Sequence, residues 1–260
     1  YKIRLPLDVM LFASANPEDY TNRGRLITPL KDRFGAQIRT HYPLEVDTEV
    51  EIALQEARPL EAPGVEVTVP EFMTEIVATL SHLARQSPHI NQRSGVSVRL
   101  TVANLETLVA NAARRALRQG ETQVVPRVSD LDALASSTSG KVEIETLEDG
   151  RDGQIVEHLL RGAVLTVFKD HVSPEHFRGV LDAFEEGTVV DAGEDVSSSD
   201  YVSLLQAMPA LSDPVTELVG AEAPPAVVAS AVEFVLEGLH LSKRLNKDAS
   251  GPRATYRGRS

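Results

Sequence analysis

An asparagine that follows an apolar segment is the first residue whose position suggests chemistry. Residues 7–15 are nearly all apolar or small, which predicts a strand buried on both faces of a parallel sheet. Asn16 comes directly after this segment and is followed by Pro17 and Glu18. Because open α/β sheets bind ligands at the carboxyl ends of their strands, Asn16 could orient a water molecule or contact a phosphate there. The alternative is an Asx turn before the proline.

Arg99 is a second candidate because it lies near the start of a predicted helix. Apolar side chains recur at helical spacing over residues 97–119, with Ser97 as the expected N-cap. A cation in the first turn opposes the helix dipole, so its presence needs a separate reason. Contact with a phosphate is one such reason, and a salt bridge to Glu75 or Glu106 is the other.

Three motifs together resemble AAA+ ATPases of the magnesium-chelatase I subunit and MoxR-like group. Residues 16–18 read Asn-Pro-Glu after an apolar strand, residues 30–34 read Leu-Lys-Asp-Arg-Phe, and residues 94–99 contain Gly-x-Ser-x-Arg. The resemblance implies that Asn16 is the sensor-1 residue, which positions the attacking water near the γ-phosphate of ATP. It also implies that Arg99 is sensor 2, which contacts the γ-phosphate of the ATP bound to its own subunit.

Arg33 is, by the same resemblance, the arginine finger that reaches the nucleotide of a neighbouring subunit. A planar and permanently charged guanidinium can bond two oxygens of the transferred phosphoryl group. Arg33 could instead pair with Asp32 or with a helix C-terminus. Arg23 and Arg25 lie in the loop between the motifs and are alternatives for the finger or solvated loop charges. Of these two, Arg25 is the one that we group with Arg99 as a candidate for nucleotide binding.

Two parts of an ATPase site are missing from this sequence. It contains no G-x-x-x-x-G-K-[ST] loop to cradle the phosphates, and no apolar strand ending in acidic residues precedes residue 7 to hold Mg²⁺. The resemblance places both parts upstream, so ATP and Mg²⁺ would be held mainly by residues that this chain lacks. The chain alone is therefore expected to be inactive, and no metal site is predicted in it.

Composition narrows the class of protein. The net charge of -12 argues against general binding of nucleic acid, because a polyanion would be repelled. The absence of cysteine excludes disulfides, thiolate catalysis and cysteine-bound metal centres. No apolar stretch approaches the roughly 20 residues that span a bilayer, and no secretory leader is present. We therefore expect a cytoplasmic protein that binds no membrane.

Periodicity predicts a chain that is mainly α with a small α/β remnant. A short strand is expected over residues 37–42. Helices are expected over residues 44–58, 71–86, 97–119, 126–135, 154–171, 174–186, 200–208 and 226–245.

These elements divide into four predicted regions. Residues 1–46 would be the C-terminal end of an AAA+ α/β core, and residues 47–140 a helical lid that carries sensor 2. A C-terminal helical domain would follow over residues 150–246. Residues 247–260 have little apolar content and predict a disordered basic tail.

The resemblance implies a ring-shaped hexamer in which ATP hydrolysis drives the remodelling of a partner protein. The implied partner is a protein with a von Willebrand A domain, and the work done is either porphyrin metallation or a chaperone-like function. The alternative is a non-enzymatic helical interaction module in which the AAA+ residues are remnants.

Overall fold

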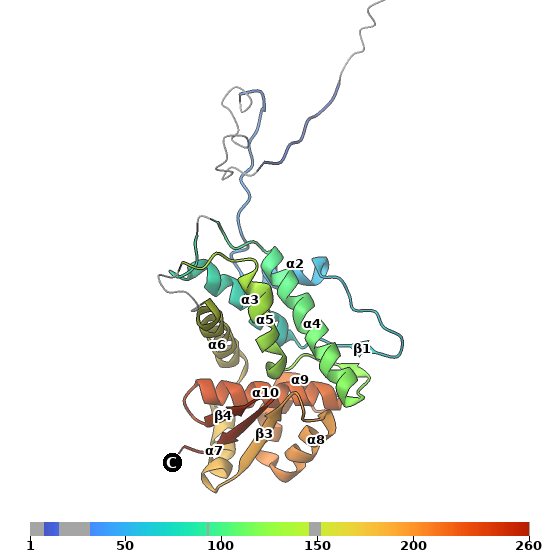
Figure 1. The fold of residues 1–260 in the computed structure, drawn as a ribbon, viewed down its shortest axis with the longest axis vertical. Coiled ribbons are helices and arrows are strands. Elements are labelled where there is room, and N and C mark those ends of the chain that lie inside the picture. Colours follow the sequence, from blue (N-terminus) through green and yellow to red (C-terminus); the bar gives the residue numbers. More distant parts are fainter. Residues whose placement is uncertain (1–7, 16–31, 93, 146–151, 260) are drawn as a thin grey trace, which may run out of the picture. The chain divides into compact units, whose positions relative to one another are not determined.

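The computed structural model describes residues 8–15, 32–92, 94–145 and 152–259. The chain divides into two units, residues 1–41 and residues 42–260. The described part of the first unit contains neither helix nor strand, whereas the second unit is mainly helical (Figure 1).

The described residues of the first unit do not form the strands that the sequence predicts. Residues 8–15 form no strand, and the side chain of Phe12 is 89% exposed. A strand is stabilised by backbone hydrogen bonds to a neighbouring strand, and the described residues of this unit provide no such neighbour. The predicted strand over residues 37–42 is wrong for the same reason, and Ile38 is 87% exposed.

The helices of the second unit largely follow the predicted positions. In chain order they are α2 (Val46–Glu56), α3 (Glu71–Gln86), α4 (Arg99–Gln119), α5 (Leu134–Ser139), α6 (Asp152–His171), α7 (Phe177–Glu185), α8 (Ser198–Ala207), α9 (Ser212–Val219) and α10 (Pro225–Leu241). Short 3-10 helices span Val128–Ala133 (η1), Pro174–His176 (η2) and Pro209–Leu211 (η3). The helix predicted over residues 126–135 is instead divided between η1 and α5, and α9 was not predicted because Pro214 interrupts its pattern.

The strands among the described residues form two small sheets. In the first, β1 (Glu66–Val67) pairs in parallel with β2 (Gln123–Val124). The second is antiparallel in the order β3-β5-β4, with bounds Val189–Gly193, Arg253–Arg257 and Asn246–Ser250.

The prediction of a disordered tail is wrong, because residues 246–257 form the hairpin β4–β5. Tyr256 anchors the hairpin: it pairs with Val190 of β3 and is only 2% exposed. Its hydroxyl donates a hydrogen bond of 2.6 Å to Glu237 of α10, and Lys247 of β4 donates another of 2.7 Å to the same carboxylate. A buried tyrosine, pairing with β3 and ion pairs such as Lys247–Glu237 and Arg253–Asp195 thus hold a segment whose overall apolar content is low.

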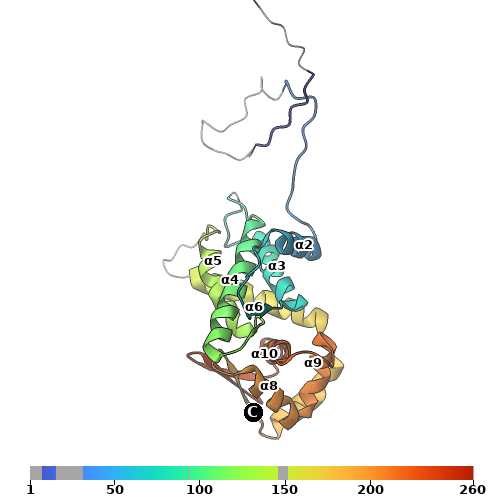
Figure 2. The same cartoon turned by 90° about the vertical axis from the view of Figure 1, so that its right-hand side faces the viewer.

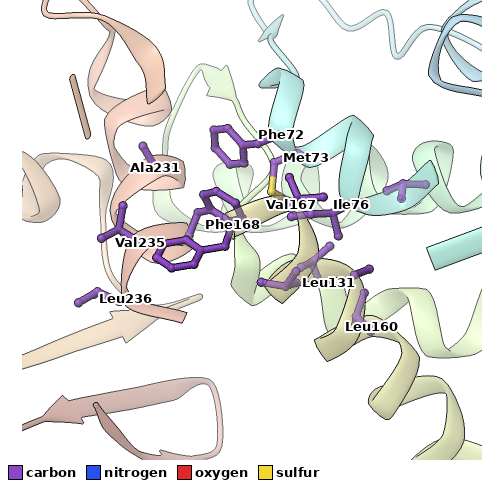
Figure 3. Packing of buried hydrophobic residues seen from close by; sticks show 14 of the residues in the cluster. Phe72, Met73, Ile76, Leu131, Leu160, Val167, Phe168, Ala231, Val235 and Leu236 are labelled. Atoms are coloured by element: carbon purple, nitrogen blue, oxygen red, sulfur yellow. The ribbon is translucent and has the colours of Figure 1, made fainter. Parts of the chain in front are cut away.

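The hydrophobic core lies between α3, α6 and α10. Phe72 of α3 stacks on Phe234 of α10 with ring centroids 4.5 Å apart, and Phe168 of α6 meets Phe234 edge-on at 5.7 Å. Figure 3 shows labelled side chains of the three helices from close by, with Phe168 of α6 between Phe72 of α3 and Val235 of α10 in this view. Seen nearly end-on in Figure 2, α10 lies among α6, α8 and α9.

This core crosses the boundary predicted near residues 140–150. Leu80 of α3 and Leu159 of α6 belong to the same buried cluster, so packing joins the predicted lid to the predicted C-terminal domain. The assignment of these regions to parts of an AAA+ protein stays a prediction. Among the described residues, no helix is both long enough and apolar enough to cross a membrane.

Candidate functional site

The four predicted site residues fall in different parts of the chain. Asn16 and Arg25 lie outside the described residues. Arg33 lies in an exposed turn of the first unit, and Arg99 is the first residue of α4 in the second unit.

Arg99 is exposed and makes few contacts. Its Nε donates a hydrogen bond of 3.3 Å to the hydroxyl of Ser97. The salt bridge to Glu75 or Glu106 that the sequence left open is absent, and both carboxylates have other partners. In the described part of the chain, Arg99 therefore has no acidic partner.

The start of α4 differs by one residue from the predicted cap. The N-cap position is Val98, which has helical backbone angles and a side chain that cannot cap. Ser97 partly takes over this function, because its hydroxyl accepts from the N–H of Arg99 at 3.3 Å and its carbonyl from Leu100 at 2.8 Å. The first turn of α4 thus has capping contacts without any carboxylate.

The loop before α4 is held closely from one side. Gly95 has a φ of +72°, a backbone conformation that residues other than glycine rarely adopt. A Cβ atom at this position would lie 2.4 Å from the hydroxyl of Tyr42. The next residue, Val96, is completely buried. The backbone that leads to Arg99 is therefore fixed although Arg99 itself is exposed.

An ion pair between a partly buried arginine and a fully buried glutamate supports this loop. Both terminal nitrogens of Arg85 on α3 donate to the two oxygens of Glu49 on α2, at 2.5 and 2.8 Å. The Nε of Arg85 donates to the carbonyl of Val96 at 2.9 Å. No motif in the sequence indicates this pair, since its members are 36 residues apart. The available signal was Glu49 itself, which shares a helix face with Ala53 and so needed a buried partner.

A larger buried network lies at the other end of α4. Arg115 binds Asp130 through Nε and a terminal nitrogen, with the shortest distance 2.9 Å, and its guanidinium also donates to the carbonyl of Val125 at 2.7 Å. Burial alone would lower the pKa of Arg115, but the charge and hydrogen bonds of Asp130 raise it, so the guanidinium stays charged. Arg127 is fully buried beside it, donates to Ser198 at 2.6 Å and lies 5.1 Å from the ring of Tyr201. This network joins α4 to α8.

A pocket of ≈ 310 Å³ lies between α10, α6, η1 and the β3–β5–β4 sheet. Two buried carboxylates of α10 face it, Glu233 and Glu237. Each already has partners within the chain: Tyr201 donates to Glu233 at 2.6 Å, and Tyr256 donates to Glu237 at 2.6 Å. We interpret these carboxylates as the polar contacts that attach α8 and the sheet to α10.

In the ranges that the structure describes, no three His, Asp or Glu side chains are grouped so that they could hold a metal ion. Comparison with known proteins gives no match to a family model, to a curated protein or to a solved structure.

Proposed function

We propose that this chain is part of an AAA+ ATPase similar to the magnesium-chelatase I subunit, and that Arg99 contacts a phosphate of its ATP. The observation that carries the proposal is the state of Arg99: exposed, at the start of a helix of 21 residues, and without an acidic partner among the described residues.

The surroundings of Arg99 favour an anion. The positive end of the helix dipole and the charge of the guanidinium repel each other, and an anion placed between them is attracted by both. A phosphate suits the site because its oxygens can accept several N–H groups of a planar guanidinium at once. ATP bound by the full-length protein would supply such a phosphate.

The other roles in the proposal rest on the resemblance. Asn16 would orient the attacking water, and Arg33 would reach the nucleotide of the neighbouring subunit in a homo-oligomeric ring, with Arg25 as a further nucleotide contact. Mg²⁺ and most of the ATP would be held by residues that this chain lacks. The phosphoryl transfer would drive the remodelling of a protein with a von Willebrand A domain in the cytoplasm, for porphyrin metallation or for a chaperone-like function.

The test compares ATP affinity of the full-length protein with and without Arg99. A hydrogen bond to a charged group contributes about 1.5–3 kcal/mol, so Arg99→Ala should weaken ATP binding by about tenfold or more. Affinity is measured with a fluorescent ATP analogue at constant Mg²⁺ concentration.

The matched control is Arg118→Ala at the other end of the same helix. Arg118 is also exposed, and it pairs with Glu194 at 3.3 Å. Its removal should leave ATP affinity within about twofold of the wild type. If Arg99→Ala and Arg118→Ala bind ATP equally well, the proposed role of Arg99 is wrong and the helical interaction module becomes the better hypothesis.

A further inference from the structure

Glu49 of the Glu49–Arg85 pair makes further contacts besides the ion pair. Glu49 is fully buried and, besides Arg85, accepts a hydrogen bond from the hydroxyl of Thr101 on α4 and lies 2.9 Å from Nε2 of His82. Contacts from α3 and α4 therefore meet at one carboxylate of α2. A carboxylate held in this way fixes the plane of the guanidinium that binds it.

The plane of Arg85 matters because its Nε–H group points to the loop. With both terminal nitrogens on Glu49, the Nε–H is directed at the carbonyl of Val96 at 2.9 Å. These donors belong to one rigid planar group, so a fixed carboxylate on one edge fixes the position of the carbonyl on the other. Val96 is three residues before Arg99.

Arg85 also holds the residue that limits movement of Gly95. The ring of Tyr42 lies 4.7 Å from the guanidinium carbon of Arg85, within the range of a cation–π interaction. The hydroxyl of the same tyrosine occupies the space beside Gly95. One guanidinium therefore restrains the loop twice, directly at Val96 and through Tyr42 at Gly95.

We propose that Arg85 is a positioning residue for Arg99: held by Glu49 and Tyr42, it sets the 95–98 loop so that Arg99 points away from the protein at a fixed angle. This inference rests on the proposed contact between Arg99 and ATP. It adds that phosphate binding depends on a partly buried group that itself touches no nucleotide.

The packing of α3 on α4 does not depend on Arg85 alone. The hydroxyls of Ser81 and Thr101 lie 2.7 Å apart in a buried hydrogen bond between the same two helices. Apolar side chains of both helices, such as Leu80 and Leu105, belong to the common core. Replacing Arg85 should therefore loosen the loop and leave α4 in place.

The experiment uses Arg85→Lys in the full-length protein, with Ser81→Ala as the matched control. Lysine keeps a cation beside Glu49, so no buried carboxylate is left unpaired, but it cannot bind Glu49 and Val96 in one plane. Ser81→Ala removes a contact between the same helices, and it leaves the hydrogen bond from Thr101 to Glu49 and all contacts of Arg85 in place. Amide hydrogen exchange over residues 94–98 and ATP affinity are measured for both variants.

We expect Arg85→Lys to speed exchange over residues 94–98 by about tenfold, and to weaken ATP binding by about fivefold because the cation is present but less well oriented. Ser81→Ala should change neither. In a double-mutant cycle, Arg85→Lys should add little to the loss caused by Arg99→Ala, since both act through the same contact.

The outcomes separate this inference from the proposed function. If Arg99→Ala weakens ATP binding while Arg85→Lys leaves exchange and affinity unchanged, Arg85 is not a positioning residue and the proposed function stands. Additive losses in the double variant would equally overturn the positioning role. If Arg85→Lys speeds exchange but neither variant changes affinity, the loop is positioned as described and the proposed role of Arg99 fails.

Discussion

The two ends of α4 use arginine in opposite ways. Arg115, near the C-terminal end, is 1% exposed, and Asp130 and the Val125 carbonyl satisfy its guanidinium. Arg99, at the N-terminal end, is exposed and has only a hydroxyl as partner in the described part of the chain. A buried arginine with a full set of acceptors is explained by the fold it stabilises, whereas the fold gives no such explanation for an arginine that opposes the helix dipole without an acidic partner among the described residues.

An arginine packed on a tyrosine lies at each end of α4. Beneath the loop at the N-terminal end, Arg85 lies over Tyr42, and at the other end Arg127 lies over Tyr201. The first of these arginines holds a loop that presents an exposed side chain, and the second is fully buried and donates to Ser198 of α8. An arginine over a tyrosine thus positions a loop at one end of α4, and it stabilises the packing of buried elements at the other end.

The largest effect is expected from breaking the buried pair at the C-terminal end. Asp130→Ala leaves Arg115 charged and buried, which typically costs about 3–5 kcal/mol. The free energy of unfolding, measured with urea, should fall by that amount. The control is Glu194→Ala, which removes a partner of Arg114 and Arg118 at the surface and should cost less than about 1 kcal/mol. Equal costs for the two variants would show that burial does not distinguish these ion pairs.

A smaller difference in stability is expected between glycine-to-alanine substitutions at the two ends of α4. Gly95 and Gly120 have nearly the same φ, +72° and +71°, but a Cβ at Gly120 would meet nothing within 4 Å. Gly120→Ala should therefore cost about 1 kcal/mol from backbone strain alone. Gly95→Ala should cost about 2–3 kcal/mol, because the Tyr42 hydroxyl must also move. Urea unfolding of both variants measures the difference.

Tyr42→Phe provides the check on this explanation. Without the hydroxyl, the nearest atom to a Cβ at Gly95 is the ring carbon at 3.6 Å, an ordinary contact. Gly95→Ala combined with Tyr42→Phe should then cost about as much as Gly120→Ala. If Tyr42→Phe does not relieve the cost at Gly95, the loop is not held by this contact and the comparison between the two ends loses its basis.

Much of the helical fold could be predicted from the sequence, because the apolar residues of α3, α4, α6 and α10 recur at helical spacing. The sheet of β3, β5 and β4 could not. It depends on contacts between residues far apart in the chain, such as Tyr256 with Val190 and with Glu237. The low apolar content of residues 247–260 predicted disorder, because composition does not show that Tyr256 becomes buried.

The candidate site divides along the same line. Arg99 could be found from its position in a short motif, whereas Glu49 and Arg85 could not, because they meet only when α2 and α3 pack together. The structure was also needed to test the predicted salt bridge of Arg99, because it shows Glu75 and Glu106 bonded to other groups, while the phosphate contact stays a proposal. A short sequence motif therefore indicated Arg99, whereas the residues that hold its loop could be found only from tertiary contacts.

The smallest expected effect is on how the free energy of unfolding depends on pH. It arises from two buried tyrosines, one near the C-terminal end of α4 and one in the β3–β5–β4 sheet. Burial, followed by the nearby charge of Glu233, raises the pKa of Tyr201 well above the ordinary 10.0, and burial with Glu237 does the same for Tyr256. Above pH 10 the unfolded chain loses these protons while the folded chain keeps them. The unfolded state then binds fewer protons, so stability should fall as pH rises, by at most about 1.4 kcal/mol per pH unit for each tyrosine.

Urea unfolding between about pH 9 and about pH 11.5 measures this slope. Tyr256→Phe should lower stability at neutral pH, because Glu237 loses a hydrogen-bond donor, yet it should make the alkaline decline shallower by removing one titrating group. Tyr201→Phe should act in the same way through Glu233. A decline that stays equally steep when both tyrosines are replaced would mean that other groups cause it, and that the two buried hydroxyls do not hold their protons as this geometry requires.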